Sequence, residues 1–84
     1  MAEVIEIKML VLLHEFEGRL PTKVYKEIES LAVHREWGIA LENLCEQLYE
    51  FNLPIESEAL GKIKELTELM QLSSERTWRS LVKE

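Results

Sequence analysis

Apolar residues recur every three or four positions along most of the chain, which is the spacing of an amphipathic helix. The first such segment runs from Ala2 to about Glu17, where Gly18 is suited to the left-handed conformation that ends many helices. The β-branched residues at positions 4–7 are also compatible with a short strand. The positions predicted to face the core are Ile5, Met9, Leu12, Leu13 and Phe16, and Val4, Ile7, Leu10 and Val11 widen the apolar arc.

The same spacing predicts a second and a third helix. The second begins at Pro21 or the residue after it, because proline suits a first helical turn, and it ends near Val33. The third runs from about Glu36 to Phe51 and ends where Asn52 follows. The positions expected to be buried are Val24, Tyr25, Ile28, Leu31 and Ala32 in the second helix, and Trp37, Ala40, Leu41, Leu44, Cys45, Leu48 and Phe51 in the third.

A fourth helix is predicted over about residues 56–71, and a short fifth over about 75–83 with Ser73 or Ser74 as its cap. Gly61 costs a helix interior about 1 kcal/mol relative to Ala, and we interpret it as allowing a close helix contact. The expected buried positions are Leu60, Ile63, Leu66, Thr67, Met70, Trp78, Leu81 and Val82. The sequence therefore predicts an all-α fold, a compact bundle of four to five short helices in one domain over residues 1–84.

Length and composition narrow the possible classes of protein. A chain of 84 residues has room for one core. Its longest apolar run has five residues, whereas a membrane-spanning helix needs about 20, so we expect a cytoplasmic protein. The single cysteine, Cys45, excludes an internal disulfide, and together with His14 and His34 it is too little for a zinc site. We expect neither a metal nor a cofactor.

The net charge of −6 arises from one segment of the chain. Residues 36–61 hold six glutamates and no Lys or Arg, whereas residues 1–35 hold six glutamates against five basic residues, and residues 62–84 hold four against five. This charge repels phosphates, so we expect no nucleic acid and no membrane as a partner. The glutamates of the acidic segment are Glu36, Glu42, Glu46, Glu50, Glu56 and Glu58.

Glu42, Glu46 and Glu50 stand four residues apart on the predicted third helix. Like charges at this spacing destabilise a helix by roughly 0.2–0.5 kcal/mol per pair. Such a run is often only a solvated face. The functional interpretation is a surface that attracts a cationic protein, formed by the six glutamates and Tyr49.

A resemblance supports the functional interpretation. The stretch Glu-Trp-Gly-Ile-Ala-Leu-Glu-Asn-Leu-Cys-Glu-Gln-Leu-Tyr-Glu at 36–50, followed by Leu-Pro-Ile at 53–55, Met-Gln-Leu at 70–72 and Trp78, resembles small helical immunity proteins of bacteria, the MafI-like and contact-dependent growth inhibition immunity families. These families protect bacteria by binding a cognate toxin domain, often a nuclease with a basic surface. The resemblance implies a toxin inhibitor whose target is a nuclease, and among nucleases we expect an RNase. The family carries over no contact residues, so the site is inferred from charge.

Two other functions remain open. Acyl carriers are acidic four-helix domains with a modified serine at a helix start; Ser57 has a comparable place but lacks the Asp-Ser-Leu motif. The chain is also compatible with a structural adaptor or a homodimer that pairs through Val4, Ile7 and Val11, and this pairing does not conflict with an immunity function.

Individual residues give little support for catalysis. Trp37 and Trp78 are of a type that anchors interfaces, but their apolar stripes favour core packing, whereas Tyr49 fits either place. His14 and His34 are interpreted as ordinary boundary or surface residues. Because useful carboxylates need a cleft that shifts their pKa, we do not expect an enzyme.

Overall fold

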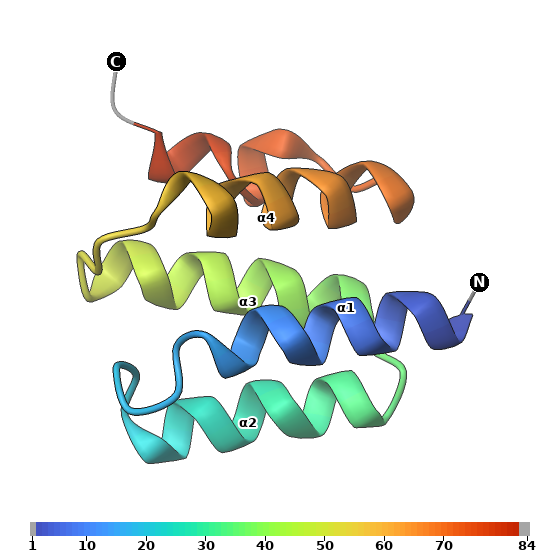
Figure 1. The fold of residues 1–84 in the computed structure, drawn as a ribbon, viewed down its shortest axis with the longest axis horizontal. Coiled ribbons are helices and arrows are strands. Elements are labelled where there is room, and N and C mark those ends of the chain that lie inside the picture. Colours follow the sequence, from blue (N-terminus) through green and yellow to red (C-terminus); the bar gives the residue numbers. More distant parts are fainter. Residues whose placement is uncertain (1, 83–84) are drawn as a thin grey trace.

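The computed structural model describes residues 2–82 and has the expected all-α architecture (Figure 1). Its four helices are α1 (Ala2–His14), α2 (Thr22–Val33), α3 (Trp37–Glu50) and α4 (Ser57–Leu69). Two single 3₁₀ turns follow, η1 (Ser74–Arg76) and η2 (Arg79–Leu81). All four helices of this part of the chain run side by side, and the C-terminal turns pack against α3 beside α4. None of the helices within residues 2–82 has the length and apolarity needed to cross a membrane.

The core is built around α1, which packs against each of the other three helices. All five core positions predicted for the first helix are buried, so the strand interpretation of residues 4–7 is wrong. The other helices contribute the apolar side of each amphipathic pattern, as the sequence predicts. The core contributions outside α1 are Phe16, Leu20, Ile28, Ala32, Ala40, Leu41, Leu44, Cys45, Leu48, Ala59, Ile63 and Leu66.

Most helix boundaries lie within one or two residues of their predicted places. α1 is shorter than predicted because it ends at His14, and turns occupy residues 15–19 before the chain enters α2, with Gly18 at a φ of 83°. The next three helices share another way of ending. In each, the residue after the cap is left-handed and is not glycine, and the following backbone N–H bonds back five residues. These left-handed residues are Arg35, Asn52 and Gln71, and the bonds join Glu36 N to Leu31 O, Leu53 N to Leu48 O and Leu72 N to Thr67 O.

The predicted fifth helix is wrong, because residues 74–81 form two 3₁₀ turns; Lys83, its predicted end, lies outside the described residues. Thr77 interrupts the helix because its backbone, at φ −119° and ψ −100°, is not helical, and its side chain is fully buried. Its hydroxyl donates to the Ser73 carbonyl at 3.0 Å and lies 3.0 Å from the hydroxyl of Thr67 on α4. The predicted cap at Ser73 is confirmed, since its hydroxyl accepts from the Glu75 amide.

Three expectations about packing need correction or refinement. Phe51 is exposed rather than buried, because α3 has already ended. Gly61 makes no close helix contact, since a Cβ at this position would meet nothing within 4 Å. The close contact occurs at Gly38 instead, where a Cβ would lie 3.2 Å from the Leu72 side chain. Trp37 and Trp78 are half-buried against the core, as favoured. The half-buried rather than fully buried positions also include Val24, Tyr25, Leu31, Leu60, Met70, Leu81 and Val82.

Candidate protein-binding groove

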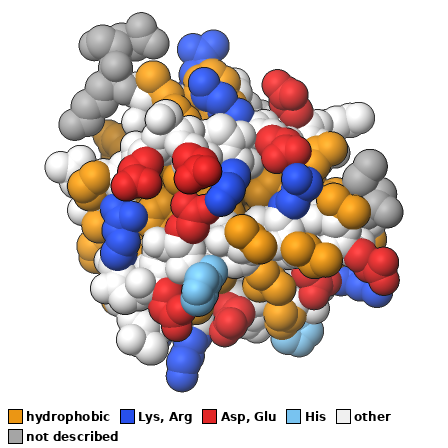
Figure 2. All heavy atoms as spheres, viewed as in Figure 1, with side chains coloured by type: hydrophobic (Ala, Val, Ile, Leu, Met, Phe, Trp, Pro, Cys, Tyr) orange, Lys and Arg blue, Asp and Glu red, His pale blue; other side chains and the backbone are white. Residues whose placement is uncertain are grey.

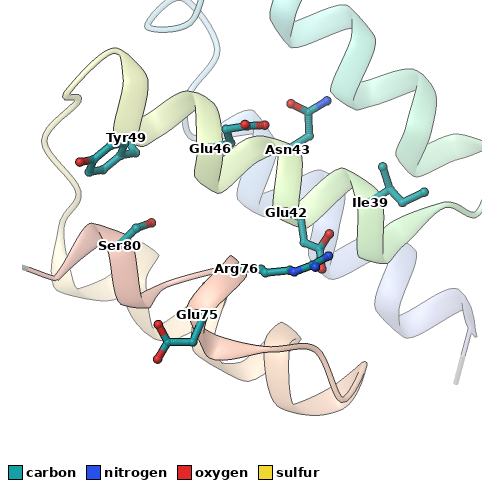
Figure 3. Close-up of a pocket in the computed structure, with 8 residues that line it drawn as sticks. All are labelled: Ile39, Glu42, Asn43, Glu46, Tyr49, Glu75, Arg76 and Ser80. Atoms are coloured by element: carbon teal, nitrogen blue, oxygen red, sulfur yellow. The ribbon is translucent and has the colours of Figure 1, made fainter.

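Two adjoining hollows lie between α3 and the C-terminal turns. The first has a volume of about 500 Å³ and is shown in Figure 3. It is lined by Ile39, Glu42, Asn43, Glu46 and Tyr49 of α3 and by Glu75, Arg76 and Ser80 from the facing wall. The second, of about 720 Å³, lies at the end of α3, contains Glu50, and shares Tyr49 and Ser80 with the first. Together they form one open groove, called the α3 groove below.

Carboxylates dominate the charge of the α3 groove. Glu42 and Glu46 line its first part and Glu50 its second, so the periodicity of α3 places one carboxylate per turn. These three are called the acidic ridge. Within residues 2–82, none of the three has a basic group within 4.0 Å in a salt bridge. Three exposed or half-buried anions therefore face the solvent beside the groove.

The facing wall adds two charges that the sequence analysis missed, Glu75 and Arg76. Figure 3 shows the Arg76 side chain extending across the groove towards Glu42. Because Glu75 cancels Arg76, the groove keeps the negative charge of the acidic ridge. The only sequence signal for this wall was the apolar spacing around Trp78, and it predicted a helix rather than a groove wall.

Two apolar side chains in the groove are open to solvent. Tyr49 is 61% exposed and Ile39 is 53% exposed, so neither contributes much to the core. Tyr49 lies at the junction of the two hollows, and Figure 3 shows its ring beside Ser80. An aromatic residue next to charged groups is typical of binding hot spots. Of the two places considered for Tyr49, the structure gives the surface one.

The other three glutamates of the predicted surface do not line the groove. Glu36 precedes α3, at the opposite end of the helix from Glu50. Glu56 and Glu58 begin α4. Glu58 acts on Lys62, where the pKa is raised mainly by a hydrogen bond to Glu15 and in smaller part by the charges of Glu15 and Glu58. The sequence grouped these three with the ridge by proximity along the chain, and none of them lines the groove, although Glu56 directly follows Ile55, which does.

The remaining candidate groups are one buried cysteine and two exposed histidines. Cys45 is buried, and desolvation, with a smaller contribution from the Glu42 charge, raises its pKa to about 12, which favours the protonated thiol. His14 lies 3.0 Å from Glu17 on the surface, and His34 contacts Ser30 of its own helix turn. Across the same part of the chain, no three His, Cys or Glu side chains are grouped to hold a metal ion.

Comparisons with protein families, curated proteins and solved structures give no match to this chain. The groove itself therefore carries the functional argument.

Proposed function

We propose that this protein is a cytoplasmic immunity protein that binds and neutralises a cognate toxin domain with a basic surface. The toxin is a nuclease, in particular an RNase, of a contact-dependent growth inhibition or related polymorphic toxin system. The single observation that supports this proposal most is the α3 groove, in which the acidic ridge lies beside exposed Tyr49 and has no internal salt bridge within residues 2–82.

The acidic ridge suits a surface built to bind phosphates. A nuclease holds its substrate with Lys and Arg, and these side chains repel one another until an anion reaches them. Carboxylates four residues apart, about 6 Å along the helix axis, offer several acceptors to such a cluster at once. The same field accelerates the encounter, because oppositely charged surfaces steer each other over distances near the Debye length.

Charge alone gives rate and specificity more than affinity, so the apolar part of the groove matters as well. Tyr49 and Ile39 are exposed in the free protein and become buried when a partner fills the groove. Neither is needed for the core, so both are available to a partner. The inhibitor has no chemistry to perform; it needs only to cover the toxin's substrate surface.

The test is a triple charge reversal, Glu42→Lys with Glu46→Lys and Glu50→Lys, compared with a matched control. The control reverses Glu3, Glu27 and Glu68, which are exposed outside the groove and change the net charge equally. Both are mixed with the purified C-terminal domain of a toxin encoded beside this gene, and binding is measured by calorimetry. We expect the ridge variant to lose at least about 100-fold in affinity and the control less than about tenfold. Equal affinities would remove the ridge from the site.

A carrier function is the second candidate, because Ser57 is exposed at the first residue of α4, as a modified serine must be. The intact mass after co-expression with a phosphopantetheinyl transferase decides between the two. An unmodified chain argues against a carrier function, and a prosthetic group on Ser57 would replace the immunity proposal.

A further inference from the structure

Tyr49 lies at the junction of the two hollows of the α3 groove, between two carboxylates. Glu46 lines the first hollow with it and Glu50 lines the second, and all three side chains are exposed. Within residues 2–82, neither glutamate forms a salt bridge, and the cations that stack on aromatic rings lie over Phe16 and Trp78 rather than over Tyr49. An exposed aromatic ring between two unpaired carboxylates suits a guanidinium, which stacks on the ring while its N–H groups donate to the carboxylates.

The second hollow is the less charged part of the α3 groove. Glu50 is its one charged lining residue, whereas the first hollow is lined by three glutamates and an arginine. Its volume of about 720 Å³ leaves room for a large side chain. The apolar residues that line it are Leu48, Tyr49, Leu53, Pro54, Ile55 and Leu81.

The walls of the second hollow are already held in place in the free protein. On the loop wall, the Leu53 amide donates to the last turn of α3 at 3.1 Å, and the Arg19 guanidinium donates to the Pro54 carbonyl. On the other wall, the Leu81 amide donates to the Trp78 carbonyl at 3.0 Å, and both leucines pack against the core. A pocket that is ordered in advance spares its ligand the entropy cost of ordering it.

The contact between α1 and α4 offers no such site to a cation. Figure 2 shows acidic and basic side chains mixed on one face of the molecule. Between α1 and α4, Lys8 lies 3.1 Å from Glu65, and Lys62 pairs with Glu15. Those glutamates have cations of their own, whereas the acidic ridge has none in a salt bridge within residues 2–82. An incoming arginine therefore meets uncompensated negative charge at the ridge.

We propose that the partner contacts the α3 groove through a segment that carries an arginine and, within a few residues, a large apolar side chain, best an aromatic one. The arginine stacks on Tyr49 between Glu46 and Glu50, and the apolar side chain fills the second hollow. Figure 3 shows Arg76 extending towards Glu42, which leaves the other two ridge carboxylates to the partner. This inference rests on the proposed function, because it describes the contact segment of the toxin.

An NMR titration with capped tripeptides tests this chemistry without the toxin. The probe is acetyl-Arg-Gly-Phe-amide, whose two side chains lie on one side of an extended chain, and the controls carry Lys in place of Arg or Ala in place of Phe. We expect the probe to bind with a dissociation constant of roughly 1–10 mM, and each control at least about threefold more weakly. Intermolecular NOEs should join the Phe ring to the methyl groups of Leu53, Ile55 and Leu81. Equal affinities of probe and controls, no binding up to about 30 mM, or ring NOEs to Ile39 alone overturn the proposal.

Two variants of α3 locate the arginine and separate this inference from the proposed function. Tyr49→Ala removes the ring, and Ile39→Ala is its control, because both side chains are exposed on the same helix and alanine preserves that helix. Tyr49→Ala should weaken the probe at least about threefold, whereas Ile39→Ala should leave its affinity unchanged. If the toxin domain depends on the acidic ridge but binds Tyr49→Ala as tightly as the unaltered chain, this contact is wrong and the proposed function stands. If the probe binds as expected but the toxin domain does not bind the unaltered chain, the immunity function is wrong and the contact chemistry stands.

Discussion

The substitution Glu46→Lys tests whether the acidic ridge exists at the expense of folding. Glu46 lies in the middle of the ridge, four residues from Glu42 and four from Glu50, and it is exposed. Each of the two like-charge pairs costs roughly 0.2–0.5 kcal/mol, and a lysine converts both into attractive pairs of similar size. Against this, the introduced lysine would share the groove with Arg76 and lose part of the gain. We expect the free energy of unfolding to rise by about 1 kcal/mol.

Urea unfolding followed by circular dichroism measures this gain at two salt concentrations. At a low salt concentration of about 50 mM NaCl, we expect the full rise of about 1 kcal/mol in the free energy of unfolding. In a thermal unfolding experiment, the same rise corresponds to a melting temperature about 5 °C higher for a domain of this size. In about 1 M NaCl, where the Debye length is about 3 Å, most of the gain should disappear. Glu46→Gln removes the repulsion without adding attraction and should give about half the effect.

The control is Glu68→Lys, an exposed position on α4 that follows Lys64 by four residues and should gain nothing. An unchanged stability of Glu46→Lys at low salt would show that the ridge carries no folding cost. A gain that is equally large at high salt would show that the cause is not electrostatic. Under the proposed function, the stabilised variant binds its toxin more weakly, which is the trade-off expected where a charged surface serves binding.

Three further predictions concern single residues. Gly61→Ala should raise the free energy of unfolding in urea by about 0.5–1 kcal/mol, because the added Cβ meets open space in α4. Gly18→Ala should lower it by roughly 1–2 kcal/mol, because φ at this residue is 83°. The opposite sign in either variant would contradict the corresponding explanation. Thr77→Val should cost about 1–3 kcal/mol by leaving the Ser73 carbonyl without its donor, and a neutral result would show that the buried hydroxyls are not coupled to stability. Burial raises the Cys45 pKa from 9.0 to about 12 in the folded chain, so the unfolded chain loses the thiol proton at a lower pH. The protonated thiol therefore contributes its full stability below pH 9, and this contribution is lost as the pH rises towards 12. Cys45→Ala should therefore show a shallower fall in unfolding free energy between about pH 9 and 11, and an unchanged slope would argue against this shift.

The sequence predicted the helices well because their pattern is local. The spacing of apolar and polar positions identified every α-helix of residues 2–82 and the whole buried face of α1. Helix ends were harder to predict, since Arg35 and Gln71 take a left-handed conformation for which neither residue type has a preference. Asn52 was predictable, because asparagine adopts this conformation more often than most residues. The C-terminal turns were mispredicted because the bond between Thr77 and Thr67 spans ten residues, and no local pattern reveals it.

The same distinction explains how much of the groove was predictable. Glu42, Glu46 and Glu50 share a face because helical periodicity places them there, and periodicity is visible in the sequence. Glu75 and Arg76 complete the groove only because the C-terminal segment docks beside α3, which is a matter of tertiary structure. The glutamates at 36, 56 and 58 were included because they are near the ridge along the chain, and none of them lines the groove.

The two walls of the groove are held in different ways, and this difference bears on how a partner would be recognised. α3 is fixed by five buried side chains, so the spacing of the acidic ridge is set by a helix that cannot move without opening the core. The facing wall is built from isolated 3₁₀ turns, and Thr77 tethers it to α4 through one hydroxyl pair. Under the proposed function, the ridge supplies a constant electrostatic attraction to basic toxins, while the residues around Arg76 and Ser80 determine which toxin surface fits. The electrostatic attraction and the selection by shape then reside on opposite walls, and the second wall can change without disturbing the helix that supports the first.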